Sequence, residues 1–121
     1  MEREAVDRWV QRYVRAWETN APEDVGDLFT EDAAYYTAPY REQWRGRDGI
    51  VAGWLDRKDV QGDWSFRHET LAVCDDVAFV RGWTEYRTDS DYANLWVVSL
   101  GEDGRCSEFT EWWMPVEGTA P

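Results

Sequence analysis

Glu111 is the residue best suited to chemistry, because it places a carboxylate among aromatic side chains in the segment "FTEWW". If this segment is a β-strand, its side chains alternate, so Phe109, Glu111 and Trp113 share one face. A charge buried among aromatic rings without a partner is costly. Either this face is exposed to solvent, or Glu111 has a partner and a function.

A second β-rich segment, "FVRGWTEY", offers that partner in Arg81. With the same period of two, this strand would present Arg81, Trp83 and Glu85 to the interior. A bidentate guanidinium–carboxylate pair would satisfy both charges and lower the pKa of the carboxyl group. Two interpretations stay open. The pair is a buried tie that sets the register of the sheet, or Glu111 orients or deprotonates a substrate or water while Arg81 holds an anionic oxygen.

The nine tryptophans indicate an aromatic-lined cavity or a subunit interface, because several of them stand among charged residues. Core packing is the alternative for each one. The sole histidine, His68, is of a type that can act as acid and base near neutral pH, but most such histidines are exposed or have a structural hydrogen bond. The tryptophans expected to line a cavity are Trp17, Trp54, Trp64 and Trp96.

The composition is that of one acidic domain. With 121 residues, of which 43% are hydrophobic and 16% aromatic, the chain is long enough for one core and too short for two. We therefore place a single domain over residues 1–121. The formal charge of −12 and the lack of a basic stripe argue against binding to nucleic acids and to anionic membranes.

The cysteines and the N-terminal segment favour a cytoplasmic protein. Cys74 and Cys106 form no C-x-x-C motif, so we expect neither a metal site nor a redox site, and we interpret both as buried thiols in a reducing compartment. The first twenty residues carry charges where a signal peptide needs an apolar stretch, and no apolar run reaches transmembrane length.

The hydrophobic pattern predicts helices in the first half of the chain. From Glu4 to Glu18 apolar residues recur at spacings of three and four, as in an amphipathic helix. Pro22 favours the start of a short second helix. A short strand in "EDAAYYTAP", a polar loop in "YREQWRGRDG" and a third helix in "GIVAGWLDRK" follow.

The second half has the period of strands. Four β-rich segments are separated by the turn clusters "CDD", "TDSD" and "GEDG", which predicts four consecutive antiparallel strands. These segments are "DWSFRHETLAV", "VAFVRGWTEYR", "YANLWVVSL" and "RCSEFTEWWMPV". Helices followed by strands argue for an α+β fold in which a curved sheet wraps around helices.

The chain resembles the nuclear-transport-factor-2-like superfamily, and more narrowly its SnoaL-like group. The resemblance rests on "WVQRYVRAWETNAPEDVGDLFTEDAAYY", "RGRDGIVAGW", "VAFVRGWTEY" and "DGRCSEFTEWWMP", which together cover nearly all of the sequence. It implies a cone in which a strongly bent antiparallel sheet wraps around three N-terminal helices and encloses one pocket. The group includes ketosteroid isomerase, polyketide cyclases, limonene epoxide hydrolase, scytalone dehydratase and members without catalysis, so the fold alone settles no chemistry.

Resemblance to ketosteroid isomerase in "VQRYV" places Tyr13 at the position of the oxyanion-hole tyrosine of that enzyme. Its base and its second acid fall on the regions that contain Thr37 and, on a later strand, Asn94 and Trp96. None of these side chains takes up a carbon-bound proton at neutral pH, so steroid isomerisation is not expected.

Limonene epoxide hydrolase resembles the chain at more positions. Its arginine, water-activating carboxylate, tyrosine and amide positions carry Arg81, Glu111, Tyr35 and Thr37 in this sequence. The carboxylate that protonates the epoxide falls on Trp83, so epoxide opening would require Glu85 to take over.

The expected function is acid–base chemistry without a cofactor on a small apolar or aromatic substrate: cyclisation, isomerisation, dehydration or water addition. Glu111 is the expected base, Arg81 its electrostatic partner, and Tyr13 and Tyr35 the hydrogen-bond donors. The side chains expected to contact the ligand are Trp17, Thr37, Trp54, Trp64, Trp83, Glu85, Asn94, Trp96, Phe109 and Trp113. The alternatives are a ligand-binding protein without catalysis, an epoxide hydrolase-like activity, and a purely structural dimer. We expect a homodimer, and in the structural case its interface would be the outer face of the sheet around Trp112.

Overall fold

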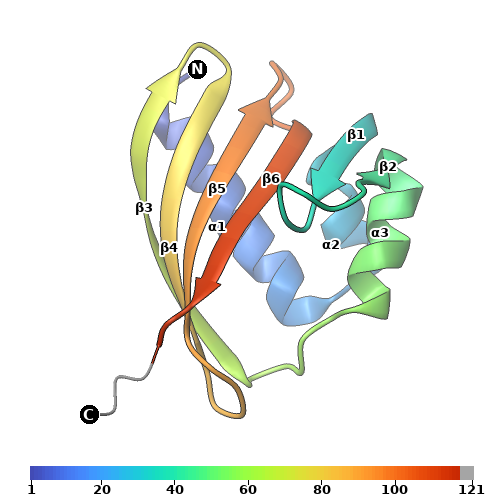
Figure 1. Ribbon diagram of the computed structural model, residues 1–121. Coiled ribbons are helices and arrows are strands. Elements are labelled where there is room, and N and C mark those ends of the chain that lie inside the picture. The colour runs from blue at the N-terminus through green and yellow to red at the C-terminus, as the bar shows by residue number, and fades with distance from the viewer. Residues whose placement is uncertain (118–121) are drawn as a thin grey trace.

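The computed structural model describes residues 1–117 and shows helices packed within one curled sheet that does not close (Figure 1). The last four residues of the expected domain lie outside this range. Within it, the helices are α1 (Arg3–Thr19), α2 (Pro22–Gly26) and α3 (Gly46–Asp56). The strands are β1 (Phe29–Tyr36), β2 (Trp44–Arg45), β3 (Trp64–Cys74), β4 (Val77–Tyr86), β5 (Tyr92–Leu100) and β6 (Cys106–Pro115). The predicted α+β cone is confirmed.

The first helix, α1, lies on the concave side of the strands β3 to β6 (Figure 1). Its buried residues recur at spacings of three and four, which is the amphipathic pattern expected from the sequence. They are Val6, Trp9, Val10, Tyr13 and Ala16. The helix ends at Asn20, which adopts a left-handed conformation (φ 52°) and donates its backbone N–H to Ala16 O. One face of α1 thus supplies much of the core.

The sheet has the strand order β2-β1-β6-β5-β4-β3. The four consecutive strands β3 to β6 pair antiparallel, as predicted. The sheet is not antiparallel throughout, however, because β1 runs parallel to β6. Their connection passes through α3 and four strands, β2 to β5, and a parallel pair requires such a long connection.

A short strand, β2, occupies part of the segment that was expected to be only a polar loop. Trp44 pairs with Tyr35 in an antiparallel register and stacks on its ring, with 4.8 Å between the ring centroids. The indole lies against Gly53 of α3, where a Cβ atom would be 2.4 Å from the ring. A glycine in α3 therefore allows Trp44 to join the core, and the polar residues around it hid this strand from sequence patterning.

The two cysteines differ in their surroundings. Cys106 is buried at the start of β6, where burial raises the pKa of its thiol to about 12. Cys74 is exposed at the end of β3, so the prediction that it is buried is wrong. Within residues 1–117, none of the helices is both long enough and apolar enough to span a membrane.

Candidate functional site

A cavity of about 400 Å³ opens near the C-terminal ends of α1 and α3, and the strands β4, β5 and β6 also line it. Helices and the segments after them contribute aromatic and charged side chains, and β4, β5 and β6 contribute polar ones. Nine of the residues predicted from the sequence line it: Tyr13, Trp17, Tyr35, Thr37, Trp54, Asn94, Trp96, Glu111 and Trp113. The inward alternation predicted for β6 is therefore confirmed, and the structure brings the carboxylate into a cavity.

Glu111 is held by two neutral donors on the neighbouring strand β5. Its Oε2 accepts hydrogen bonds from Asn94 Nδ2 and from Trp96 Nε1, both at 2.9 Å. Loss of hydration in the interior raises the pKa of the Glu111 carboxyl group to about 7, although the two hydrogen bonds act to lower it. Both hydrogen bonds go to Oε2, so Oε1 has no partner among the described residues and is left for a ligand. This suits a general base that works near neutral pH.

Asn94 is itself oriented by the next strand. Its Oδ1 accepts a hydrogen bond of 2.8 Å from the hydroxyl of Thr84, a buried residue of β4. With Oδ1 occupied in this way, the Nδ2 group points at Glu111. A hydrogen-bonded row of side chains therefore crosses β4, β5 and β6 and fixes the position of the carboxylate.

Trp96 is supported from behind by a ring on β3. Phe66 stacks on it with 4.9 Å between centroids and 14° between planes. The same ring lies over Gly82 of β4, where a Cβ atom would come within 2.5 Å of it. The absence of a side chain at Gly82 thus lets Phe66 lie against the sheet and hold the indole that donates to Glu111.

Two buried tyrosines form a hydroxyl pair in the same cavity. Tyr13 of α1 and Tyr35 of β1 have their hydroxyl oxygens 2.6 Å apart, and one of them donates to the other. Burial raises the pKa of both phenols, and the negative charge of Glu111 adds to this rise. Both therefore stay protonated at neutral pH. Because one hydroxyl only accepts within the pair, its own proton is available to a ligand.

A second carboxylate, Asp59, lies in the loop after α3 and lines the cavity. Its Oδ2 accepts hydrogen bonds from Trp17 Nε1 at 2.9 Å and from the hydroxyl of Tyr86 at 2.8 Å. Sequence reasoning missed Asp59 and Tyr86. A loop residue has no periodicity to reveal it, and Tyr86 belongs to the face of β4 that was assigned to the outside.

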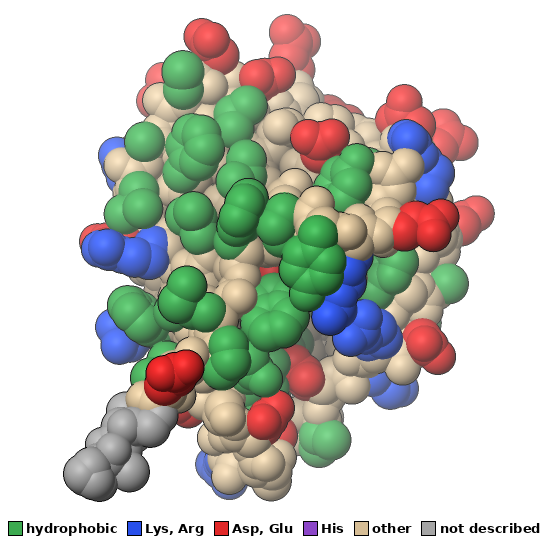
Figure 2. Space-filling model, viewed as in Figure 1, with side chains coloured by type: hydrophobic (Ala, Val, Ile, Leu, Met, Phe, Trp, Pro, Cys, Tyr) green, Lys and Arg blue, Asp and Glu red, His purple; other side chains and the backbone are tan. Residues whose placement is uncertain are grey.

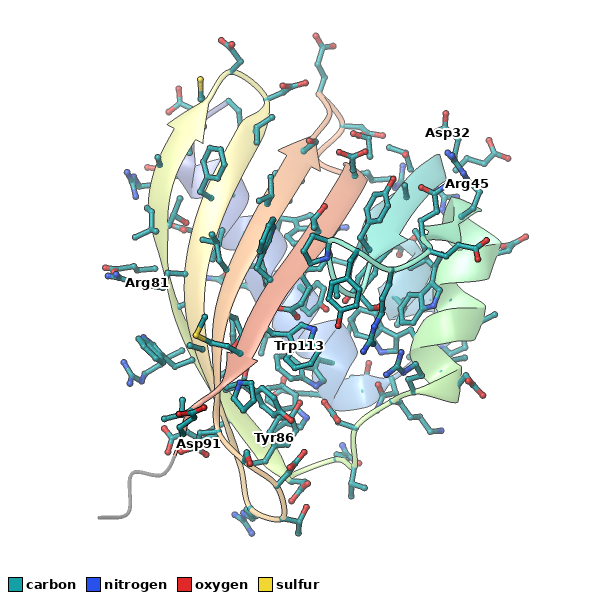
Figure 3. The ribbon with its side chains drawn as sticks, viewed as in Figure 1. Asp32, Arg45, Arg81, Tyr86, Asp91 and Trp113 are labelled. Carbon is teal, nitrogen blue, oxygen red and sulfur yellow. The ribbon has the colours of Figure 1, made fainter. Side chains whose placement is uncertain are left out.

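Trp113 lies at the rim of the cavity between β6 and the segment after β1 (Figure 3). Its Nε1 donates a hydrogen bond of 3.1 Å to the backbone oxygen of Thr37. The guanidinium of Arg41 lies 5.8 Å from the centre of its ring, a cation–π distance. This contact brings a cation to the rim, beside a tryptophan that is 38% exposed.

The prediction that Arg81 pairs with Glu111 is wrong. Arg81 points away from the cavity and pairs with Glu69 of β3 on the outer face, where both side chains are at least half exposed (Figure 3). Trp83 and Glu85 share this outer face, and Arg67 lies 5.5 Å from the centre of the Trp83 ring. The alternation itself was right, but it was assigned to the opposite face. The expectation that Arg81 lowers the pKa of Glu111 is wrong as well, because the hydrogen-bond partners of Glu111 are neutral.

Three further residues predicted near the ligand or considered for catalysis do not line the cavity. Phe109 is fully buried and stacks on Tyr13 and Tyr35, so it supports the hydroxyl pair from below. Trp64 stacks on Trp17 with 3.7 Å between centroids and lies behind it. His68 stacks on Phe66 and is absent from the cavity lining.

The remaining lining residues that sequence reasoning missed are mostly charged or lie on helix and strand ends. They are Arg41, Trp44, Arg57, Lys58, Thr84, Asp89 and Tyr92. In the described part of the chain, no three His, Cys, Asp or Glu side chains gather in a way that could hold a metal ion. The cavity instead contains a carboxylate with a raised pKa and two protonated phenols, which are the groups used in proton-transfer chemistry.

Comparison with known families gives one match, in which residues 10–109 fit the SnoaL-like domain. A comparison with curated proteins finds no significant match.

Solved structures share the fold at low sequence identity. A ketosteroid isomerase-like protein from Erwinia carotovora atroseptica has a TM-score of 0.71 at 20% identity, over 95% of this chain and 98% of the other. An NTF-2-like protein from Burkholderia xenovorans has a TM-score of 0.74 at 13% identity, over 97% and 89%. The epoxide hydrolase/cyclase-like enzyme SalBIII, of pyran ring formation in the polyether salinomycin, has a TM-score of 0.72 at 15% identity, over 89% of each chain. These similarities establish the fold. The chemistry has to be inferred from the residues of the cavity.

Proposed function

Because the chain belongs to the family of SnoaL-like domains, we propose that its cavity binds a small, largely apolar or aromatic molecule and transfers a proton within it, with no cofactor required. The observation that carries this proposal is the placement of Glu111, whose pKa of about 7 and free Oε1 suit a base that must take up and return a proton at neutral pH.

The proposed reaction begins at a carbon next to a carbonyl group. Glu111 Oε1 takes the proton from that carbon, and the electron pair of the C–H bond moves into the carbonyl to form an enolate. The free hydroxyl proton of the pair formed by Tyr13 and Tyr35 hydrogen-bonds to the enolate oxygen. If the substrate has a β,γ-double bond, the enolate is a dienolate, and the protonated Glu111 returns its proton to the far carbon, which completes an isomerisation with a shifted double bond. If the enolate instead attacks a second carbonyl, Glu111 gives its proton to the alkoxide that forms, which completes a cyclisation.

The apolar part of the substrate would lie against the aromatic walls. Trp54 and Trp17 line the cavity on the helix side and Trp113 lines it at the rim. Each indole N–H is already used, by Asn20, Asp59 and Thr37 respectively, so these side chains offer ring surface rather than donors.

Epoxide hydrolysis is a weaker second candidate, since it needs an acid to protonate the leaving oxygen. Glu85 cannot serve, because it lies on the outer face. Asp59 is a second carboxylate in the cavity and is the candidate for this role by its position. Replacement by asparagine at Asp59 would abolish epoxide opening but would leave proton exchange on a ketone intact.

The test of the main proposal is proton exchange on a probe ketone. Tetralone, an apolar bicyclic ketone, is incubated in deuterated buffer at pH 7, and loss of its α-proton signal is followed by NMR. We expect exchange by the wild type above the buffer rate and none by Glu111→Gln. Glu108→Gln, which changes an exposed glutamate on the same strand, is the matched control and should exchange as the wild type does.

Equal exchange by the wild type and Glu111→Gln would overturn the assignment of the base. Tetralone that binds, shown by calorimetry, without any exchange would overturn the catalytic proposal and favour a ligand-binding protein. Absence of both binding and exchange would contradict the proposed class of ligand.

We further propose a homodimer formed through the outer face of the sheet. Apolar side chains there are cross-strand neighbours: Leu95 faces Trp112, and Trp83 and Met114 flank Ala93. These strands expose a continuous hydrophobic area on the side shown in Figure 2. A second copy of this face would match it in shape and polarity, whereas a monomer would leave Trp112 51% exposed. The proposed compartment remains the reducing cytoplasm, where Cys74 would stay a thiol.

A further inference from the structure

Three cations gather at the rim of the cavity. Arg41 follows β1, while Arg57 and Lys58 follow the last residue of α3, and all three line the cavity. Figure 2 shows Lys and Arg side chains beside the hydrophobic side chains near the middle of this face. The chain as a whole has 13 basic and 25 acidic residues, yet the cavity lining holds three of each. Positive charge is therefore concentrated here relative to the rest of the molecule.

These cations have no acidic partner in the described part of the chain. Within residues 1–117, the ion pairs are Arg81 with Glu69 and Arg105 with Asp103, and none involves a residue of the cavity. Arg41 instead contacts the rings of Tyr40 and Trp113. The charges at the rim are thus not balanced by the protein at short range.

The acids of the cavity are occupied by neutral donors. Asp59 accepts from Trp17 and Tyr86. Asp89 accepts from the backbone N–H of Ser90 and from the hydroxyl of Tyr92. Glu111 accepts from Asn94 and Trp96 on β5. Carboxylates and cations line one cavity without pairing, so the cations are free to bind an anionic group of a ligand.

We propose that the ligand carries a carboxylate that binds Arg41, Arg57 and Lys58 at the rim, while its apolar body extends along the tryptophans toward Glu111. This rests on the proposed function for the identity of the cavity as a substrate site. Binding of a remote charged group would fix the reactive carbon relative to the base, because energy from a non-reacting part of a substrate is used for positioning.

The geometry favours a carboxylate over a phosphate. Arg57 and Lys58 lie just after the C-terminal end of α3, where the helix dipole is negative and the backbone N–H of Arg57 is used by Gly53 O and Trp54 O. Phosphate sites commonly use the opposite end of a helix. A carboxylate is planar and carries a single charge, so side-chain cations can bind it without the backbone N–H groups of a helix N-terminus.

The experiment compares three probes of one shape by calorimetry at pH 8 and low salt: naphthoate, its neutral amide naphthamide, and naphthyl phosphate. The wild type should bind naphthoate about ten-fold more tightly than naphthamide, which corresponds to one effective ion pair. The double variant Arg57→Gln/Lys58→Gln should lose this preference, and higher salt should reduce it in the wild type. Arg15→Gln, which removes one exposed charge on α1, is the matched control and should keep it.

Equal binding of naphthoate and naphthamide by the wild type, including failure of both to bind at millimolar concentration, would overturn the proposal. A preference that survives in the double variant would also overturn it. Much tighter binding of naphthyl phosphate would replace the carboxylate by a phosphate ligand.

The failure of this inference is distinguishable from the failure of the proposed function. Glu111→Gln should keep the preference for naphthoate, since it leaves the rim cations unchanged. A preference for naphthoate together with no proton exchange on any ketone would support the anion site and contradict the catalysis. Proton exchange on a neutral ketone with no preference for naphthoate would support the catalysis and contradict the anion site.

Discussion

Asn94 donates a hydrogen bond from Nδ2 to Oε2 of Glu111 at 2.9 Å, so this carboxylate has a neutral amide beside it and no cationic partner among residues 1–117. A cation would stabilise the charged form strongly, whereas an amide does so only weakly. Burial therefore dominates, and the pKa of Glu111 lies at about 7.

Replacement of Asn94 by leucine should raise the pKa of Glu111 further. The substitution removes a hydrogen bond to the charged form, so the base is less ionised at pH 7 and the acidic limb of the pH–activity profile moves to higher pH. NMR titration of the Glu111 carboxyl carbon measures the shift directly. Trp96→Phe removes the other donor and should shift the pKa in the same direction. A pKa that falls or stays unchanged in both variants would contradict the proposed role of these donors.

The contribution of Glu111 to the stability of the fold should decrease as pH rises from about 4.5 to about 7. The folded pKa of Glu111 lies at about 7, above the ordinary value of 4.5, so in this range the unfolded chain ionises while the folded one keeps its proton. Glu111→Gln cannot ionise and should be more stable than the wild type at pH 8, by at most about 3 kcal/mol. The advantage should shrink at pH 5.

Thermal unfolding at pH 5 and pH 8 tests this prediction. Glu108→Gln serves as the control, because it removes an exposed carboxylate from the same strand and should show no such pH dependence. A Glu111→Gln variant that is equally or less stable than the wild type at pH 8 would show that burial does not raise this pKa.

Removal of either hydroxyl of the tyrosine pair should reduce proton exchange on tetralone. Tyr13→Phe and Tyr35→Phe each break the contact of 2.6 Å, so the remaining hydroxyl is no longer oriented toward the enolate oxygen. The loss of one such donor should lower kcat by about 100- to 1,000-fold. Both rings should stay in place, because each packs on Phe109. Exchange rates that are unchanged in the double variant would exclude the pair from the reaction.

Arg81→Gln should leave ligand binding and proton exchange unchanged. Arg81 pairs with Glu69 on the outer face, and an exposed pair of this kind contributes less than about 1 kcal/mol to stability. The measurement is calorimetric binding of naphthoate together with the exchange rate on tetralone. A large loss of either would mean that the outer face of β4 contributes to the site.

Trp112→Glu should convert the proposed homodimer into a monomer. The substitution places a charge at the centre of the outer apolar face, opposite Leu95, where it could not be hydrated in a dimer. Light scattering after size-exclusion chromatography measures the mass. Val60→Glu changes an exposed apolar residue of a loop, away from this face, and should leave the mass unchanged. A wild type that elutes as a monomer would overturn the proposed assembly.

The sequence was sufficient to predict the helices, every strand except β2, and half of the residues that line the cavity, because period and composition carry that information. The inward face of β6 could be recognised, because Phe109 is apolar and must be buried whether or not Glu111 has a function. On β4 the alternation was equally clear but its direction was ambiguous, because one set holds Arg81 and Trp83 and the other holds Gly82 and Thr84. Large side chains were assigned to the interior there, although the aromatic surface over β4 comes from Phe66 of β3.

The parts of the site that stayed hidden depend on contacts between segments. Asp59 and Arg57 follow a helix and have no period, so only the folded chain brings them to the cavity. The strand β2 was hidden in a polar stretch, because its formation requires Trp44 to pack over Gly53 of the next helix. A contact between a large ring and a glycine joins residues that are distant in sequence, so local patterns do not reveal it.

Gly82 gives this site an evolutionary constraint that its own chemistry does not reveal. It lies two strands away from Glu111 and has no side chain to reach the carboxylate, although its backbone pairs with Asn94. Phe66 can stack on Trp96 only because this glycine has no Cβ atom. Any amino-acid substitution at Gly82 adds a Cβ atom about 2.5 Å from Phe66 and displaces that ring. Selection for the acidity of the carboxylate should therefore preserve a glycine that no substrate ever meets.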